Sequence, residues 1–222
     1  MSATLRVTRS HFPVTALGHG VRLGVWVQGC PLRCPGCIAK DTWDPGAGLE
    51  VGVGTLLRDV RRAIDAGADG ITVSGGEPLE QAGPLGDLLR GVRDLRAAAA
   101  AAFDIMLYTG YEPPELDAAQ RRTAALADVL VTGRYVATAP TKLIWRGSAN
   151  QRLRLQTPLA QERYASYVDC EPAEPPIQIE TSPDGHAWWV GVPNNPDTKR
   201  AVEATLAAYG YSVESVSWRR AR

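Results

Sequence analysis

The sequence contains little of several residue types that mark common functional classes. Among its 222 residues there are 4 cysteines, 3 histidines and 2 phenylalanines. Its 24 basic and 24 acidic residues cancel, which gives no electrostatic reason to expect nucleic acid or a membrane as a partner. No apolar stretch approaches the roughly 20 residues that span a bilayer, and the first residues lack the apolar core of a signal peptide. We therefore expect a cytoplasmic protein.

The composition is otherwise that of a folded globular chain. Hydrophobic residues make up 45% and charged residues 22% of the sequence, which argues against disorder. The length allows one sizeable domain with a hydrophobic core, with room for a small appended module.

Three of the four cysteines lie close together. Cys30, Cys34 and Cys37 are spaced by four and three residues, and Cys170 is remote in sequence. In a reducing compartment such a group indicates metal ligands before disulfides. Three thiolates on one short loop can hold three irons of a cubane cluster and leave the fourth iron open to a ligand. We expect the chemistry at that open iron.

Two other kinds of metal site remain open. A structural zinc site usually has four nitrogen or sulfur ligands, and the histidines provide no pair at zinc-finger spacing. An electron-transfer cluster needs a fourth cysteine, for which Cys170 is the only candidate, although a lone cysteine is often just a small buried residue. A non-catalytic iron–sulfur or zinc protein is therefore an alternative.

Segments with strand and helix patterns alternate along the chain. Strands are expected over 21–28, 70–74, 104–108 and 128–132, and helices begin near Thr55, Pro84 and Glu115. This alternation predicts an α/β fold, a partial barrel of parallel strands built from βαβ units. A further short strand over 5–10 is expected at the sheet edge.

Polar and glycine-rich segments follow these strands directly. They are the cysteine loop, Gly75-Gly76-Glu77-Pro78, Thr109-Gly110 and Thr132-Gly133-Arg134. Because the carboxyl ends of parallel strands meet at one face, we expect all four segments to converge there.

The chain divides into three parts by pattern. A core domain is expected over 1–155, a proline-rich linker over 156–176 and a small ββαβ module over 177–222. Within the module we expect a hairpin of 177–181 and 187–192 turning at 182–185, a helix over 196–209 and a last strand over 212–218. Adjacent Trp188 and Trp189 should face opposite sides of their strand, and the outward one would form an interaction patch.

The Cys30-x3-Cys34-x2-Cys37 spacing after one strand and Gly-Gly-Glu-Pro after the next resemble the radical S-adenosylmethionine (SAM) superfamily. More closely, the chain is similar to the activating proteins of glycyl radical enzymes, above all those of anaerobic ribonucleotide reductase. Three stretches carry this resemblance: 28–43, 108–120 and 143–151, the last reading Leu-Ile-Trp-Arg-Gly-Ser-Ala-Asn-Gln. Together they span about residues 20–153, and the tail lies outside the resemblance.

The resemblance implies roles for named residues. Cys30, Cys34 and Cys37 would hold a [4Fe-4S] cluster whose open iron binds SAM. The residues expected to contact SAM are Gly36, Cys37 and Ile38 near the adenine, Ser74, Gly75, Gly76 and Glu77 near the methionine amino group, with Thr109, and Arg134 near the carboxylate. Reductive cleavage of SAM would yield a 5′-deoxyadenosyl radical, with the protein orienting the cofactor and excluding water.

The resemblance also implies partners. A glycyl radical enzyme would give up a glycine hydrogen, and a flavodoxin or ferredoxin would supply the electron. The alternative is radical chemistry on a peptide or small molecule, with the C-terminal module recognising that substrate. The chain departs from the family pattern at Ile38-Ala39, where an aromatic or histidine and then asparagine are usual, and at Thr132-Gly133-Arg134, where Asp-x-Lys is usual.

Overall fold

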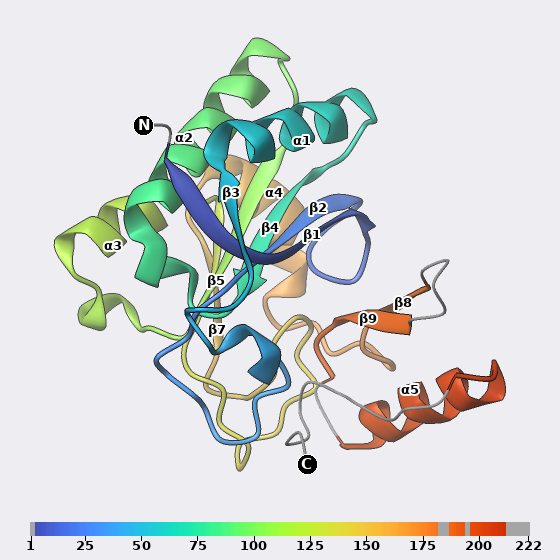
Figure 1. Ribbon diagram of the computed structural model, residues 1–222. Coiled ribbons are helices and arrows are strands. Elements are labelled where there is room, and N and C mark those ends of the chain that lie inside the picture. The colour runs from blue at the N-terminus through green and yellow to red at the C-terminus, as the bar shows by residue number, and fades with distance from the viewer. Residues whose placement is uncertain (1–2, 182–186, 194–195, 212–222) are drawn as a thin grey trace.

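The computed structural model describes residues 3–181, 187–193 and 196–211, and a seven-stranded sheet forms its centre (Figure 1). The strands lie in the order β3-β1-β2-β4-β5-β6-β7. Their bounds are β1 Thr4–Val14, β2 Arg22–Val27, β3 Leu49–Gly52, β4 Gly70–Gly75, β5 Asp104–Thr109, β6 Val129–Thr132 and β7 Arg152–Leu155.

The sheet is mixed. β2, β4, β5 and β6 are parallel neighbours, as the sequence predicts, whereas β1, β3 and β7 pair antiparallel. The expected parallel strands are thus confirmed, and the antiparallel outer strands are an addition to them. β1 enters β2 through the short segment 15–21, and strands joined so closely pair antiparallel because a parallel pair needs a long crossover.

The expected edge strand lies inside the sheet. β1 is longer than the predicted 5–10 and pairs on its outer side with β3, which the sequence analysis missed, as it missed β7. Both are only four residues long, and the alternation in Leu-Glu-Val-Gly and Arg-Leu-Arg-Leu is too short to stand out as a strand signal. The curvature of this sheet into a partial barrel stays a prediction.

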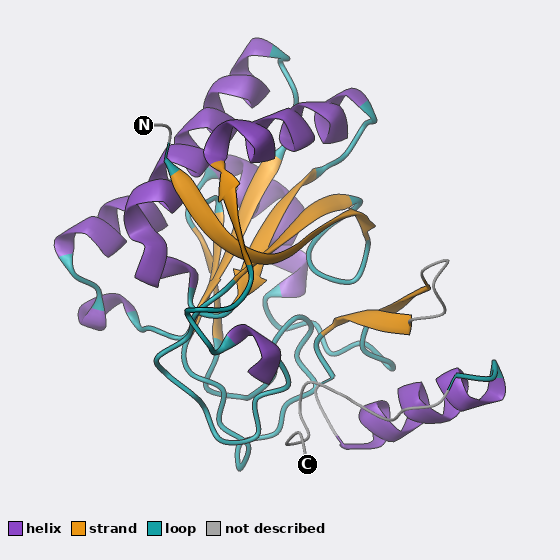
Figure 2. Cartoon of the chain, viewed as in Figure 1, coloured by secondary structure: helices purple, strands orange, loops and turns teal. Residues whose placement is uncertain are grey.

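Helices cover both faces of the sheet (Figure 2). Three helices pack in a row on one face: α1 Val53–Asp65, α2 Ala82–Ala98 and α3 Ala118–Ala124. α4 Pro158–Tyr164 packs with the opposite face. Along β5, Ile105 and Leu107 belong to the core under α1–α3, whereas Met106 belongs to the core shared with α4. This alternation is the period of two that a strand buried on both faces must have. Four single-turn 3-10 helices occur in the connections: η1 Lys40–Thr42, η2 Pro78–Gln81, η3 Pro113–Glu115 and η4 Ala165–Tyr167.

The first part of the expected linker is packed against the sheet. Residues 156–176 contain α4 and η4, and Tyr164 is fully buried with its hydroxyl 2.9 Å from Asp104 Oδ1. The apolar positions of this short helix were too few to reveal it in the sequence. The division of the chain into two domains stays a prediction.

A second, two-stranded sheet follows. β8 Ile177–Thr181 pairs antiparallel with β9 Ala187–Gly191, and α5 Pro196–Ala208 comes next. Figure 1 shows the β8–β9 hairpin as a separate small sheet, followed along the chain by α5. The expected turn at 182–185 and the expected strand over 212–218 lie outside the described residues. Among the helices of the described chain, none combines the length and apolarity needed to cross a membrane.

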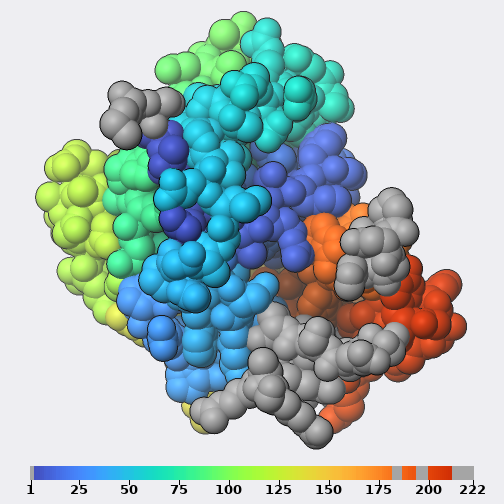
Figure 3. All heavy atoms as spheres, viewed as in Figure 1, coloured from blue at the N-terminus to red at the C-terminus, as the bar shows by residue number. Residues whose placement is uncertain are grey.

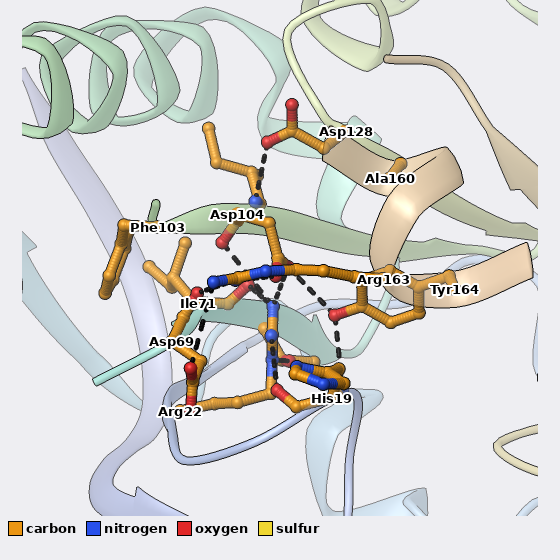
Figure 4. A network of polar contacts seen from close by, with 12 residues as sticks. His19, Arg22, Asp69, Ile71, Phe103, Asp104, Asp128, Ala160, Arg163 and Tyr164 are labelled. Atoms are coloured by element: carbon orange, nitrogen blue, oxygen red, sulfur yellow. Dashed lines mark hydrogen bonds and ion pairs between the residues drawn. The ribbon is translucent and has the colours of Figure 1, made fainter. Parts of the chain in front are cut away.

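A buried ion network closes the amino ends of the parallel strands (Figure 4). Arg22 at the start of β2 and Asp104 at the start of β5 are both fully buried and lie 2.6 Å apart. Arg163 from α4 donates to the second oxygen of Asp104 at 2.8 Å, and the Arg22 guanidinium also donates to Thr72. Burial lowers the pKa of Arg22, but Asp104 and its other partners raise it further, so the arginine stays charged.

Removing Asp104 should therefore cost far more than removing a surface acid. Asp104→Ala leaves the Arg22 charge buried without compensation, and we expect a loss of about 3–5 kcal/mol in the free energy of unfolding. The control is Asp87→Ala on α2, which breaks an exposed pair with Arg90 and should cost at most about 1 kcal/mol. Urea denaturation of both variants checks this, and similar small losses for the two would contradict it.

Candidate functional site

The four polar segments predicted to converge do so. The parallel register of β2, β4, β5 and β6 brings the cysteine loop, 75–78, 109–110 and 133–134 to one end of the sheet. Figure 2 shows the long loops gathered at that end. The sequence argument from strand ends was sufficient to find it.

Backbone hydrogen bonds close the cysteine loop at its base. The Gly29 and Cys30 N–H groups donate to the carbonyls of Thr42 and Trp43 at 2.8 and 3.1 Å. The Gln28 side-chain amide, buried beneath, donates to two more backbone carbonyls of the returning arm. This explains why the stretch that resembles the family runs from Gln28 through the Lys-Asp-Thr-Trp segment after the cysteines.

The three thiols predicted as cluster ligands lie on one loop and are available as ligands. Cys30, Cys34 and Cys37 are half-buried and free of disulfides. Burial raises the pKa of the Cys30 and Cys37 thiols, and hydrogen bonds to sulfur offset part of this, including those to Cys37 from the Ala39 N–H and the Trp43 side chain. Such N–H···S bonds tune bound clusters, and the sequence analysis did not foresee one from Trp43. Among the described residues no three metal-ligating side chains are gathered tightly enough for a single metal ion.

The two glycines after β4 make a close backbone contact with the start of the cysteine loop. Gly75 has φ +105°, a conformation that side chains disfavour. A Cβ on Gly76 would lie 2.2 Å from the Gly29 carbonyl oxygen, and the neighbouring Glu77 N–H donates to that same oxygen at 2.9 Å. The glycines are needed here to let two protein segments touch, whereas the sequence analysis assigned their freedom to ligand approach.

Gly76→Ala should therefore displace the cysteine loop. The added methyl meets backbone that cannot swing aside, so we expect about 1–3 kcal/mol of destabilisation together with a clear loss of bound iron per chain. Gly83→Ala on α2 is the matched control, because its Cβ meets nothing within 4 Å. It should keep the iron content, measured after anaerobic reconstitution. Equal iron in both variants would show that the contact does not hold the loop.

Glu77 is turned into the protein and clamps two strand ends together. It is 1% exposed. Its Oε1 accepts from the Thr109 hydroxyl at 2.8 Å and the Leu79 N–H at 3.0 Å, and its Oε2 accepts from the Gly110 N–H at 2.7 Å. The carboxylate thus joins the loop after β4 to the loop after β5. Burial raises its pKa from 4.5 to about 7, against the lowering effect of these three donors.

The raised pKa of Glu77 should make stability depend on pH. Between pH 4.5 and about 7 the folded protein keeps this proton while the unfolded chain loses it, so the free energy of unfolding falls as pH rises. The contribution is at most ~1.4 kcal/mol per pH unit. Glu77→Gln should remove this fall in cluster-free protein, measured by urea denaturation at pH 5, 6 and 7. Glu162→Gln, an exposed carboxylate on α4, should leave the fall as in the parent protein. An unchanged profile in Glu77→Gln would contradict the assignment.

A cavity of about 450 Å³ opens beside the cysteine loop. Four of the residues expected to contact SAM line it: Cys37, Ile38, Ser74 and Gly75. Trp145 lines it as well, and its buried indole N–H has no hydrogen-bond partner among the described residues. A mostly apolar cavity of this volume with a few polar groups fits one cofactor-sized ligand.

The family described as "4Fe-4S single cluster domain" matches residues 16–154. The anaerobic ribonucleoside-triphosphate reductase-activating protein of Escherichia coli is 38% identical over 149 residues, which is 64% of this chain and 93% of that protein. The proteins of the same name from Haemophilus influenzae and Vibrio cholerae are each 34% identical, over 64% of this chain and 92% of theirs. The chain belongs to the anaerobic ribonucleoside-triphosphate reductase-activating protein family.

The family model describes a 4Fe-4S cluster domain, which supports an iron–sulfur cofactor in this chain. The relatives are named as activating proteins, so the alternative of a non-catalytic iron–sulfur or zinc protein is set aside. The crystal structure of QueE from Escherichia coli is similar over 94% of this chain and 92% of that chain, with 13% identity and a TM-score of 0.41. A likeness this weak does not bear on function.

Five of the residues expected to contact SAM are not among the described residues that line the cavity. They are Gly36, Gly76, Glu77, Thr109 and Arg134. Glu77 and Thr109 take part in the clamp, and Gly76 lies in the backbone contact with Gly29. Arg134 is exposed and donates to both oxygens of Glu115 at 2.7 and 2.8 Å, which raises its pKa. In this structure its guanidinium is thus already paired with a carboxylate.

The third stretch typical of the family, 143–151, braces the loop after β6. Arg146 is buried and donates to backbone carbonyls of residues 167 and 168. Gln151 donates to the Gly133 carbonyl at 2.9 Å, and Ser148 accepts from the Val136 N–H at 3.1 Å. Only Trp145, at φ +58°, reaches the cavity from this stretch with a polar atom that lacks a partner in the described chain.

Proposed function

We propose that this chain binds SAM beside a [4Fe-4S] cluster, cleaves it reductively and uses the resulting radical to take a hydrogen atom from a glycine of a partner ribonucleotide reductase. The observation that carries the proposal is a single cavity lined both by Cys37 of the cysteine loop and by Ser74 and Gly75 at the end of β4. The names of the relatives point to the same activity.

The proposed cluster ligands are Cys30, Cys34 and Cys37. When bound and reduced, the cluster supplies one electron that splits SAM into methionine and a 5′-deoxyadenosyl radical, which becomes 5′-deoxyadenosine on taking hydrogen from the acceptor. The chain's own part is to hold three thiolates on a loop closed at its base and to seat SAM against it. A flavodoxin or ferredoxin is the proposed electron donor.

The proposed SAM contacts divide into two groups. Cys37, Ile38, Ser74 and Gly75 line the cavity and are proposed to touch the cofactor, with the Trp145 indole N–H as a further donor. Glu77, through its three hydrogen bonds, is proposed to set the shape of the cavity by joining two strand ends. The sheet is proposed to curve as the partial barrel of the superfamily, with the module from 177 onward as an appended domain.

A second acceptor class is favoured by one observation. The cavity is also lined by β9 and α5, which lie beyond residue 154, where the family match ends. A peptide or small molecule read by this module is therefore the alternative to the reductase.

The test is to incubate the reconstituted, reduced protein with SAM and with the anaerobic ribonucleotide reductase of the same organism. We expect 5′-deoxyadenosine by chromatography and a glycyl radical in the reductase by electron paramagnetic resonance. Cys34→Ala should abolish both, because it removes one of three cluster ligands. Cys170→Ala should retain both, since Cys170 packs in the core beside α4.

The presence or absence of 5′-deoxyadenosine and of the glycyl radical distinguishes the two proposed acceptor classes. SAM cleavage without a glycyl radical would favour the peptide or small-molecule alternative. No cleavage by a protein that carries its full complement of iron would overturn the proposal.

A further inference from the structure

We propose that the C-terminal module, defined here as β8, β9 and α5, is a lid over the cavity beside the cysteine loop. One side of this cavity is formed by Cys37, Ser74 and Gly75. The other side is formed by β9 together with Val202 and Leu206 of α5. The module thus supplies one of the walls of this cavity.

The module rests on the large sheet through side chains. In the described part of the chain the two sheets share no strand pairing, and no backbone-to-backbone hydrogen bond crosses between them. Figure 3 shows the module, in orange and red, seated against the dark blue N-terminal strands. A unit held by few contacts of this kind separates at a lower free energy than one held by a strand ladder.

Trp188 of β9 makes the main contact. Its ring packs edge-on against His11 at 4.7 Å and Trp26 at 6.2 Å, measured between ring centroids, and the Arg9 guanidinium lies 4.3 Å above it. Trp188 thus packs against β1 and β2, and Trp189 lines the cavity as well, while an outward interaction patch formed by one of the two tryptophans stays a prediction. The next inward residue, Val190, packs with the apolar cluster of β1 and the segment after it.

A polar contact from β8 supports the aromatic one. The Gln178 side chain accepts from the Thr15 N–H at 2.7 Å and donates to the Pro13 carbonyl at 2.8 Å. These bonds lie at the exposed rim of the contact, whereas Trp188 lies nearer the cavity. The contacts of Trp188 and Gln178 attach the β8–β9 hairpin to β1 and the residue after it, and we call these two side chains the latch.

The cavity volume gives the reason for opening. A volume of about 450 Å³ suits one cofactor-sized ligand, and a ligand seated there would occupy the space that a segment of a second protein needs. The sheet and the clamped loops form one wall and are held by backbone hydrogen bonds and buried side chains. The wall free to separate is therefore the module. For a protein acceptor, and here the inference rests on the proposed function, the lid must lift before the acceptor reaches the cofactor.

The test is hydroxyl-radical footprinting of the full-length, cluster-loaded protein, with mass spectrometry of individual side chains. Tyr108 and Trp145 line the cavity under the module and report its opening, while fully buried Phe103 reports the integrity of the core. Trp188→Ala should raise the oxidation of Tyr108 and Trp145 by about tenfold, since it removes two aromatic contacts and a cation–π contact. Phe103 should remain unmodified.

The matched control is Tyr209→Ala, which removes an aromatic ring that follows α5, is 80% exposed and lies outside the described cavity lining. Its footprint should equal that of the parent protein. If oxidation rises at Phe103 as well, Trp188→Ala has loosened the core, and Gln178→Ala then serves as the milder unlatching variant with the same expected pattern at Tyr108 and Trp145.

Unchanged oxidation of Tyr108 and Trp145 in Trp188→Ala, or in Gln178→Ala where that variant is used, would overturn the proposal that the module is a lid. The footprint does not depend on SAM chemistry. A protein that fails to cleave SAM yet shows the expected footprint would refute the proposed function and leave the lid standing.

Discussion

The contact on which the site depends is the one between two backbones at the ends of β2 and β4. The Gly29 carbonyl lies against Gly76 so closely that no side chain fits between them, and the Glu77 N–H donates to that carbonyl. The cysteine loop departs from one side of this contact and the Glu77 clamp from the other. The position of the three thiols relative to the cavity is therefore set by backbone, which a ligand cannot easily displace.

The two ends of the parallel strands are stabilised by opposite kinds of chemistry. At the amino ends, Arg22, Asp104 and Arg163 form a buried network in which each charge has a partner. At the carboxyl ends, Glu77 is buried with no ion pair to any described residue and is held by neutral donors, and burial raises its pKa to about 7. A buried carboxyl of that kind stores unfavourable desolvation, and such groups cluster at functional sites. The amino ends of the parallel strands are thus stabilised by paired charges, whereas the carboxyl ends carry the candidate site.

Sequence reasoning found the site because strand ends in a parallel sheet must meet. It placed the cysteine loop, Ser74 and Gly75 together without any coordinates. It did not find where Glu77 points, because a carboxylate after two glycines can turn outward to a ligand or inward to Gly110, and only the neighbouring strand decides. It missed β3 and β7 for a related reason: short edge strands owe their conformation to the partner they pair with, as β3 does to β1. Trp145 was noticed in the sequence, but its unsatisfied indole N–H exists only once the loop is folded.

The family match and the cavity have different boundaries, and this separates two steps of the proposed reaction. The match ends at residue 154, so the similarity to the family covers the cysteine loop and the strand ends, which are proposed to generate the radical. The opposite wall of the same cavity comes from β9 and α5, beyond that boundary. A hydrogen donor must approach the cofactor across that wall or in place of it. Radical generation in this chain would thus follow the family, whereas access to the radical would be governed by residues that the matched part of the family does not contain.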